Sequence, residues 1–299
     1  MPPVTGYLCR YCRQHSEPGE AAVSCPLCGA PFDVRPAVSE SGWMRQPMIP
    51  STTRLSCGTI RCQINGRYVP VAEFELAAGD WIYFSPHVLL WTGPAVTLTV
   101  PRSSGGRSPG LILAHGPGHI GVAENRAGEV IALPLRRGQL VCVRPGRFLC
   151  ATGSVRYRWE PSVVCYSTMM AEREYPMGGY LLTLRAAGRQ GLVLLHASGD
   201  AFIRDLAGDQ SVLVSPSSLL YWEETVDLSL HLEFAYVPGK HVRRAIWRSS
   251  RIWLRVCGPG RVAIDSAREQ PDSARTPDYE SFASWQRWDA PSTPTTRAE

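Results

Sequence analysis

The sequence predicts an all-β protein whose body is built from three pseudo-equivalent sheet units behind a cysteine-rich segment. From about Arg54 the chain consists of short apolar stretches broken by glycine and proline, which number 27 and 25 among 299 residues. This pattern is typical of strands joined by turns. Apart from a turn near 240–250, we find no convincing helical periodicity in this region. The peptide "SPHVLLW" (85–91) returns in loosened form as "RPGRFLC" (144–150) and "SPSSLLY" (215–221), which indicates a repeated unit.

The N-terminal segment carries paired cysteines with the spacing of a metal site. Cys9 and Cys12 form one C-x-x-C, Cys25 and Cys28 form a second, and twelve residues separate them. Two such turns aim four sulfurs at one tetrahedral ion, so we predict a structural zinc ribbon with no open coordination position. Gly29 lets the second turn curl toward sulfur, whereas the first turn lacks a glycine. The alternatives are four unligated thiols or a redox pair, but redox pairs usually stand singly at a helix start.

The ribbon and the rest of the chain imply four segments. We expect a zinc ribbon at 1–36, a linker at 37–53, a β domain at 54–265 and a disordered tail at 266–299. Residues 1–50 contain four arginines and four acids, which does not suit phosphate binding and favours protein docking by the ribbon. Apolar residues make up 44% of the chain and charged residues 19%, as in globular proteins.

The expected compartment follows from the absence of membrane and export signals. No apolar run approaches the roughly 18 residues of a membrane-spanning helix. The N-terminus lacks the basic and apolar regions of a secretory signal. We therefore expect a cytoplasmic protein, in which the ten cysteines are metal ligands or buried thiols before they are disulfides.

Two spacings recur around the repeated peptide. In each copy a turn glycine precedes a strand, a proline follows the strand, and a large apolar residue with a leucine comes three residues later. A valine stands ten residues after each proline and opens another alternating strand. The glycines are Gly79, Gly138 and Gly208, the prolines are Pro86, Pro145 and Pro216, and the valines are Val96, Val155 and Val226.

A second pattern consists of an apolar strand, a G-P-G or A-S-G turn and an alternating strand. It occurs at 111–122, 192–203 and 253–264. Because no further glycine–proline unit follows the last copy, we expect that copy to return to the first repeat and close the sheet, which removes edge strands. The same alignment places His115, His196 and Cys257 at equivalent positions.

Three peptides carry a resemblance to a known family: "QINGRYVPVAEFELAAGDWIYF", "AHGPGHIGV" and "LHASGDAFIRDLAGDQSVLV". From about Arg54 to Asp265 the chain resembles the altered-inheritance-of-mitochondria 24 family, and a zinc ribbon in front of this region is similar to actinobacterial members. The resemblance implies a fold like that of the tryptophan RNA-binding attenuator protein. The chain is then a double-stranded β-helix-like body of three pseudo-repeats behind a small four-cysteine zinc ribbon. It also implies self-association and supplies no catalytic residues. The family's role in yeast inner-membrane organisation does not transfer, because no targeting segment is visible.

Two further groups of residues are weighed as sites. His115, His119 and His196 lack the H-x-H spacing of cupin metal sites, so we assign them to packing and turn hydrogen bonds. The segment 239–255 places arginines beside tryptophans and suits an anionic lipid surface or nucleic-acid phosphates. The candidate anion-binding residues are Lys240, Arg243, Arg244, Arg248 and Arg251. The alternative is that these cations pair with acids of the same fold or at a subunit contact.

The expected function is a non-enzymatic binding or assembly module. The chain has no nucleophile elbow, P-loop or H-E-x-x-H motif. We expect protein partners, a homo-oligomer and contact with an anionic membrane surface, with nucleic acid less favoured. The alternatives are an RNA-binding oligomer, by analogy of fold alone, and an enzyme with an unrecognised site.

Overall fold

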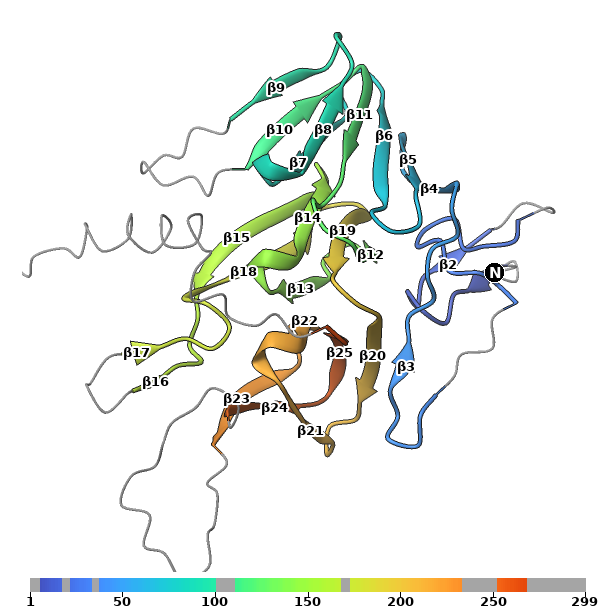
Figure 1. Ribbon diagram of the computed structural model, residues 1–299. Coiled ribbons are helices and arrows are strands. Elements are labelled where there is room, and N and C mark those ends of the chain that lie inside the picture. The colour runs from blue at the N-terminus through green and yellow to red at the C-terminus, as the bar shows by residue number, and fades with distance from the viewer. Residues whose placement is uncertain are drawn as a thin grey trace, which may run out of the picture. The chain divides into compact units, whose positions relative to one another are not determined.

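The computed structural model describes residues 6–17, 22–33, 38–100, 111–167, 173–232 and 252–267 (Figure 1). Every regular element in these ranges is a β-strand or a short 3-10 turn, so the predicted all-β fold is confirmed. No helix in these ranges is long and apolar enough to cross a membrane. The tail expected to be disordered falls, from residue 268 onward, outside the described ranges.

Three consecutive units of six strands make up the body (Figure 1). The first unit comprises β6 (Val71–Leu76), β7 (Trp81–Phe84), β8 (Leu89–Thr92), β9 (Thr97–Thr99), β10 (Ile112–His115) and β11 (Gly118–Val122). The second comprises β12 (Glu129–Leu135), β13 (Leu140–Val143), β14 (Phe148–Thr152), β15 (Val155–Pro161), β18 (Tyr180–Ala186) and β19 (Gly191–Ala197). The third comprises β20 (Ala201–Leu206), β21 (Ser211–Val214), β22 (Leu219–Glu223), β23 (Asp227–Leu232), β24 (Ile252–Cys257) and β25 (Gly260–Asp265).

The strands pair in the same way in all three units. The sixth strand lies between the first and the third, which gives the antiparallel trios β6–β11–β8, β12–β19–β14 and β20–β25–β22. The fifth strand lies between the second and the fourth, which gives β7–β10–β9, β13–β18–β15 and β21–β24–β23. Each unit therefore contributes strands to two different sheets.

Neighbouring units are joined by strand pairing. The third strand of the second unit, β14, pairs with the second strand of the first unit, β7. In the same way β22 of the third unit pairs with β13 of the second. These joints fuse trios from adjacent units into a six-stranded and a seven-stranded sheet. The body is consequently held together by backbone hydrogen bonds between units as well as within them.

Seven shorter or additional strands lie outside the units. They are β1 (Tyr7–Leu8), β2 (His15–Ser16), β3 (Met44–Arg45), β4 (Thr53–Cys57), β5 (Ile60–Asn65), β16 (Tyr166–Ser167) and β17 (Arg173–Glu174). β4 and β5 extend the sheet of β6. Within the stretch 37–53, which we expected to be a linker, β3 pairs with β20 and joins the seven-stranded sheet. This stretch therefore packs on the body as well as connecting to it.

The three prolines of the repeated peptide stand at matching corners. Each opens a 3-10 turn between the second and third strands of its unit: η1 (Pro86–Val88), η2 (Pro145–Arg147) and η3 (Pro216–Ser218). The residue before each proline is extended, as proline requires of its predecessor. The pairing register then slips at the same place, four residues after the proline, which makes a β-bulge at Leu90, Leu149 and Leu220.

The expectation that the last repeat closes the sheet is wrong. β24 and β25 pair only within the third unit, where they are the central strands of its two trios. A central strand has both edges occupied, so it has no edge left for the first repeat. Among the described residues, β8 at one end of the series and β21 at the other lie at sheet edges.

The second repeated pattern is also misaligned in its middle copy. Residues 192–203 span β19 and β20, which belong to two different units. The hairpin equivalent to β10–β11 and β24–β25 is β18–β19, whose turn reads A-G-R-Q instead of G-P-G. The second unit also carries β16 and β17 between its fourth and fifth strands.

Buried side chains form two clusters. The larger includes residues of the ribbon and of all three units, and the smaller lies mainly in the third unit. β19, which lies between β12 and β14, is buried along its whole length. Because successive side chains point to opposite faces of a sheet, both faces are covered here, which suits the continuous apolar run "GLVLLHA".

Candidate metal centre

Four cysteine sulfurs meet in one small volume at the N-terminus. The Sγ atoms of Cys9 and Cys28 are 3.6 Å apart, and those of Cys12 and Cys25 are 3.9 Å apart. All four lie within 4.8 Å of one another. A tetrahedral zinc with Zn–S bonds of about 2.3 Å separates its sulfurs by roughly 3.8 Å. The four side chains can therefore hold a metal ion without rearrangement, and they are the only group of three or more such ligands in the described ranges.

Two equivalent backbone turns place the sulfurs. In the first, the N–H of Arg13 donates to the carbonyl of Cys9 at 2.8 Å, and in the second the N–H of Gly29 donates to Cys25 at 2.8 Å. Gly29 has φ 75°, which suits a residue without Cβ. Arg13 has φ 57° at the same position of the first turn. The first turn thus takes the same left-handed conformation with an arginine where the second turn has a glycine.

The thiols perturb one another strongly because they are so close. Hydrogen bonds from neighbouring thiols, from Cys12 first, lower the pKa of Cys9 and lower that of Cys25 to about 7. The pKa of Cys12 is raised by its contact with Cys25, and that of Cys28 by its contact with Cys12. Four thiolates at this spacing repel one another unless a cation neutralises them, so full deprotonation requires a bound metal ion.

The first turn is attached to the third unit by ion pairs. The Arg13 guanidinium pairs with Glu223 at the end of β22 and lies 3.4 Å from Asp205 in β20. Arg261 of β25 donates to the backbone carbonyl of Tyr11. Arg261 also forms a bidentate ion pair with Asp205, in which Nε donates to Oδ1 and Nη2 donates to Oδ2, both at 2.8 Å. Arg13 and Arg261 therefore share one carboxylate at the joint between ribbon and body.

This joint changes the titration of its charged groups. Burial by itself raises the pKa of Asp205, but hydrogen bonding and attraction to Arg261 outweigh burial and leave that pKa lowered. Burial lowers the pKa of Arg261, and Asp205 more than compensates, so that pKa is raised. Both groups are consequently held in their charged forms near neutral pH.

The ribbon also contacts the second unit and β4. Arg136, which follows β12, donates to the backbone carbonyl of Arg13, and the amide of Gln14 donates to the carbonyl of Pro134 at 3.4 Å. In the second turn, the carbonyl of Pro26 accepts a hydrogen bond from the N–H of Ser56 at 3.0 Å. The cysteine site therefore lies against the body, and its two turns contact different parts of it.

The histidines weighed as metal ligands are separated in the structure. His115 ends β10, with Nε2 3.3 Å from the hydroxyl of Thr99. His119 of β11 has Nδ1 3.5 Å from the carboxylate of Glu73. His196 is 2% exposed in β19, and burial lowers its pKa. Each histidine thus has a packing or polar role of its own.

The predicted equivalence of His115 and His196 is wrong. In the shared topology His115 pairs with Trp81, and the matching pair of the second unit joins Leu140 to Arg185. Cys257 does occupy the equivalent position in the third unit, where it pairs with Ser211. Sequence comparison missed this because it aligned β19 with β10.

The basic candidates Lys240, Arg243, Arg244, Arg248 and Arg251 lie outside the described residues. Of that segment, the structure describes Trp253, which is partly buried in β24, and Arg255, which is exposed in the same strand. They stand two residues apart and so lie on one face of the strand.

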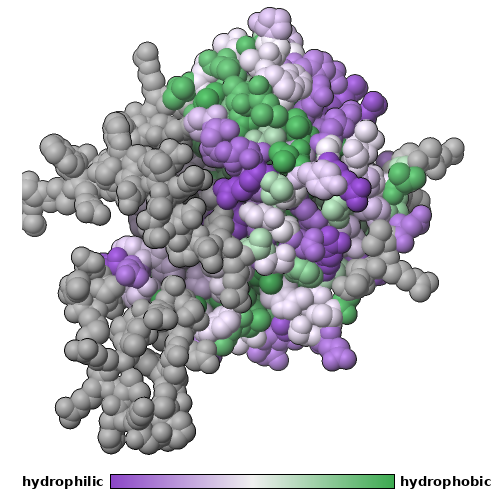
Figure 2. Space-filling model, in the orientation of Figure 1, coloured by the Kyte–Doolittle hydropathy of each residue, from purple (hydrophilic) through white to green (hydrophobic). Residues whose placement is uncertain are grey.

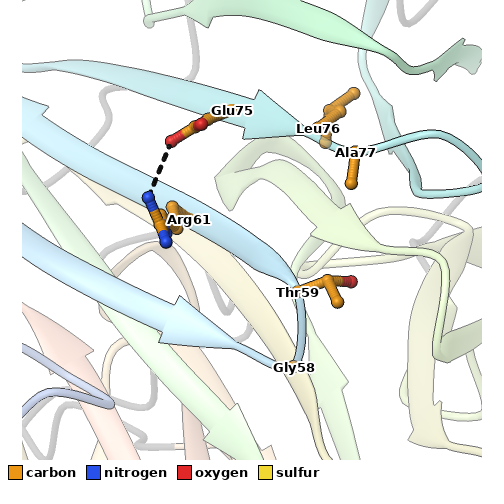
Figure 3. A pocket seen from close by; sticks show the side chains of 6 residues that line it. All are labelled: Gly58, Thr59, Arg61, Glu75, Leu76 and Ala77. Atoms are coloured by element: carbon orange, nitrogen blue, oxygen red, sulfur yellow. Dashed lines mark ion pairs between the residues drawn. The ribbon is translucent and has the colours of Figure 1, made fainter.

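A surface hollow with a volume of about 320 Å³ lies beside the β4–β5 hairpin. Its lining is Gly58, Thr59, Arg61, Glu75, Leu76 and Ala77 (Figure 3). Arg61 and Glu75 form an ion pair across it at 3.6 Å, and both side chains are largely exposed. Water screens an exposed ion pair of this kind, so the pair contributes little to stability.

Comparison with known proteins agrees with the fold. A crystal structure of a Streptococcus pyogenes protein from structural genomics is 18% identical, with a TM-score of 0.52, and covers 76% of this chain and 98% of its own. At this identity the likeness shows the fold alone. No curated protein matches the chain. The model of the family described as Mitochondrial biogenesis AIM24 matches residues 62–267, which leaves out the four-cysteine site. By this match over more than half of its length, the chain belongs to the mitochondrial biogenesis AIM24 family.

Proposed function

We propose that this protein is a non-enzymatic assembly module, in which a zinc ribbon braces a β body that associates with other protein chains and with copies of itself. The observation that carries the proposal is an apolar surface on the first unit. Leu90 and Trp91 of β8 are 55% and 42% exposed, and Leu98 and Val100 at β9 are 38% and 65% exposed. Figure 2 shows a hydrophobic area over this unit. Contiguous exposed apolar side chains, aromatic ones above all, are typical of protein interfaces.

The metal in the four-cysteine site is proposed to be zinc. Four thiolates in a tetrahedral arrangement are the usual ligands of structural zinc, and they leave no coordination position for a catalytic water. Because each turn of the ribbon contacts the body, the ion stabilises the attachment of residues 6–33 to the β units. We propose that the ribbon's docking function begins with this contact to its own chain.

The body is proposed to be a double-stranded β-helix-like array of three internal repeats. Its support is the identical strand pairing, corner proline and bulge of the three units. A repeat array stacks through its neighbours and has two different ends. Such ends are natural sites of association.

A second contact is proposed for the basic segment. Lys240, Arg243, Arg244, Arg248 and Arg251 form a run of cations without an acid, which suits an anionic surface in a cytoplasmic setting. Substitution of these residues by serine should weaken binding to vesicles containing phosphatidylserine. Binding to RNA with a steep salt dependence would instead favour the alternative of an RNA-binding oligomer.

Sedimentation of the purified, zinc-loaded chain tests the assembly function. We expect the average mass to rise above the 32.9 kDa of one chain as concentration increases over about a hundredfold range. A chain that remains a monomer throughout would contradict self-association. Turnover of a substrate by this chain, lost when a residue in the described ranges is substituted, would contradict the non-enzymatic proposal.

A further inference from the structure

We propose that copies of this chain join head to tail, with the free edge of β8 in one copy paired to the free edge of β21 in the next. The inference rests on the proposed self-association and names its surface and its partner. The partner is a second copy of the same chain, and the contact repeats the joint that already links consecutive units within the chain.

The strand order leaves two complementary edges. Between units, the third strand of the later unit always pairs with the second strand of the earlier one, as in β14–β7 and β22–β13. β8 is a third strand with no earlier unit, and β21 is a second strand with no later unit. In the described part of the chain neither has a partner on that side. Each edge is therefore half of a joint that the chain builds twice.

Side chains of β8 are exposed where their equivalents in the other two units are buried. Leu90, at the bulge, is 55% exposed, whereas its equivalents Leu149 and Leu220 are both 0% exposed. Trp91 is 42% exposed, whereas Tyr221 at the same position of the third unit is 2% exposed. The same backbone position is thus buried wherever a preceding unit is present.

The β21 edge shows the matching difference. Leu213 is 43% exposed, and its equivalent in the first unit, Tyr83, is 1% exposed where β14 pairs with β7. Ser211 at the start of β21 is also exposed. Burial of leucine and tryptophan side chains lowers the free energy in proportion to the apolar area removed from water. Pairing of the two edges would remove such area and would therefore be favourable.

The existing joints set the register of the new one. Cys150, Ala151 and Thr152 pair with Phe84, Tyr83 and Ile82. Transfer of this register by unit equivalence places Trp91 opposite Val214, Thr92 opposite Leu213 and Gly93 opposite Val212. The N–H groups of Ser85 and Arg144 donate to the carbonyls of Leu149 and Leu220 at 3.4 and 3.2 Å. In the new joint the N–H of Ser215 would donate to the carbonyl of Leu90.

The other edge strands of the three units do not compete for this role. β9, β15 and β23 are fourth strands and lie at an edge in every unit, so none lacks a partner that its equivalents have. β15 carries Arg156, Arg158 and Glu160 and ends at Pro161, which are the features that protect natural edges. β8 and β21 contain no charged residue and no proline. Ribbon contacts at Pro134 cover one end of β12.

The proposed contact joins two different surfaces, so it propagates. A head-to-tail contact gives a closed ring if its rotation closes and a filament if it does not. It also predicts complementation between chains that each lack one edge. This property separates it from a symmetric contact in which β8 meets β8.

The test uses two charge substitutions and a matched control. Leu90→Lys blocks the β8 edge, Leu213→Lys blocks the β21 edge, and Val163→Lys places the same charge at an exposed valine (86%) outside both edges. Mass is measured by sedimentation on zinc-loaded full chains, and far-ultraviolet circular dichroism with melting temperature verifies that each variant is folded.

We expect the wild type and Val163→Lys to assemble, and each edge variant alone to remain at 32.9 kDa. An equimolar mixture of Leu90→Lys and Leu213→Lys should give a 1:1 complex of twice that mass and nothing larger. If the wild type assembles and both edge variants assemble equally well, the edge inference fails while self-association stands. If Leu90→Lys alone prevents assembly, the contact is symmetric and the inference also fails. A monomeric wild type overturns both proposals.

Discussion

A buried ion pair joins the second and third units, and its contribution to stability can be measured by substitution. Nη1 of Arg147 in η2 lies 3.0 Å from Oδ2 of Asp265 at the end of β25, and the two side chains are 1% and 0% exposed. Asp265 also accepts hydrogen bonds from three backbone N–H groups, those of Ser198, Gly199 and Ala267, at 2.8–2.9 Å. The carboxylate therefore fixes the corner of one unit against the last strand of the next.

Asp265→Asn keeps the shape and one oxygen acceptor but removes the charge that faces Arg147. Removal of one partner of a buried ion pair costs about 3–5 kcal/mol. Because an acceptor is retained, we expect the free energy of unfolding to fall by about 3 kcal/mol, at the lower end of that range. Arg147→Met should cost a similar amount, since it leaves the carboxylate buried. The double variant should lose about 2 kcal/mol less than the sum of the single variants.

Urea unfolding of zinc-loaded protein at pH 7, followed by tryptophan fluorescence, measures these values. The dependence of the unfolding free energy on urea should stay unchanged, so that the midpoints report stability. Arg61→Met is the control, because its ion pair with Glu75 is 75% and 52% exposed and should contribute less than about 1 kcal/mol. Single variants at Arg147 and Asp265 that match this control, with additive effects, would refute the assignment of a buried, coupled pair.

Three further predictions concern the ribbon and the first unit. Under the proposed role of the metal in attaching the ribbon to the body, Cys9→Ser should abolish stoichiometric zinc, measured by elemental analysis, and lower the melting temperature. Cys257→Ser should keep the zinc, and a Cys9→Ser chain that also keeps it would contradict the site. Arg13→Gly should be more stable than Arg13→Ala by up to about 1 kcal/mol. Both variants lose the ion pairs, but only glycine adopts φ 57° without the steric cost of a Cβ. Equal unfolding midpoints would show that this conformation carries no strain. Burial raises the pKa of Glu124, yet His87 and Arg126 outweigh burial and lower it from 4.5 to about 2. Its contribution is present above pH 4.5 and is lost as pH falls toward 2, so the stability difference between wild type and Glu124→Gln, on the order of 3 kcal/mol at pH 7, should shrink in urea titrations below pH 4.5; a constant difference would refute this linkage.

Much of the fold was predictable because its signals are local. Proline restricts its own φ and the conformation of the residue before it, so Pro86, Pro145 and Pro216 marked the three corners without reference to the rest of the chain. Glycine and proline punctuation indicated strands and turns. The C-x-x-C spacing brings two sulfurs together within a single turn, so the four-cysteine site was also visible.

The errors came from pairings between distant residues. Alternation of apolar and polar residues shows that a stretch is a strand but does not name its partner. For this reason residues 192–203 were read as one hairpin although β19 and β20 belong to different units, and the last repeat was expected to close the sheet. The strand β3 has no pattern of its own and is held by β20.

The all-β class, the three proline corners and the four clustered cysteines could be predicted from the residues alone, since each depends on residues within a few positions of one another. The tertiary structure shows which strands pair and that Arg13 takes a left-handed conformation beside Glu223. It also shows which strand edges stay unpaired, among the described residues, at the two ends of the series. These features depend on hydrogen bonds and contacts between residues that are distant in the sequence. Local residue preferences do not specify which distant segments pair.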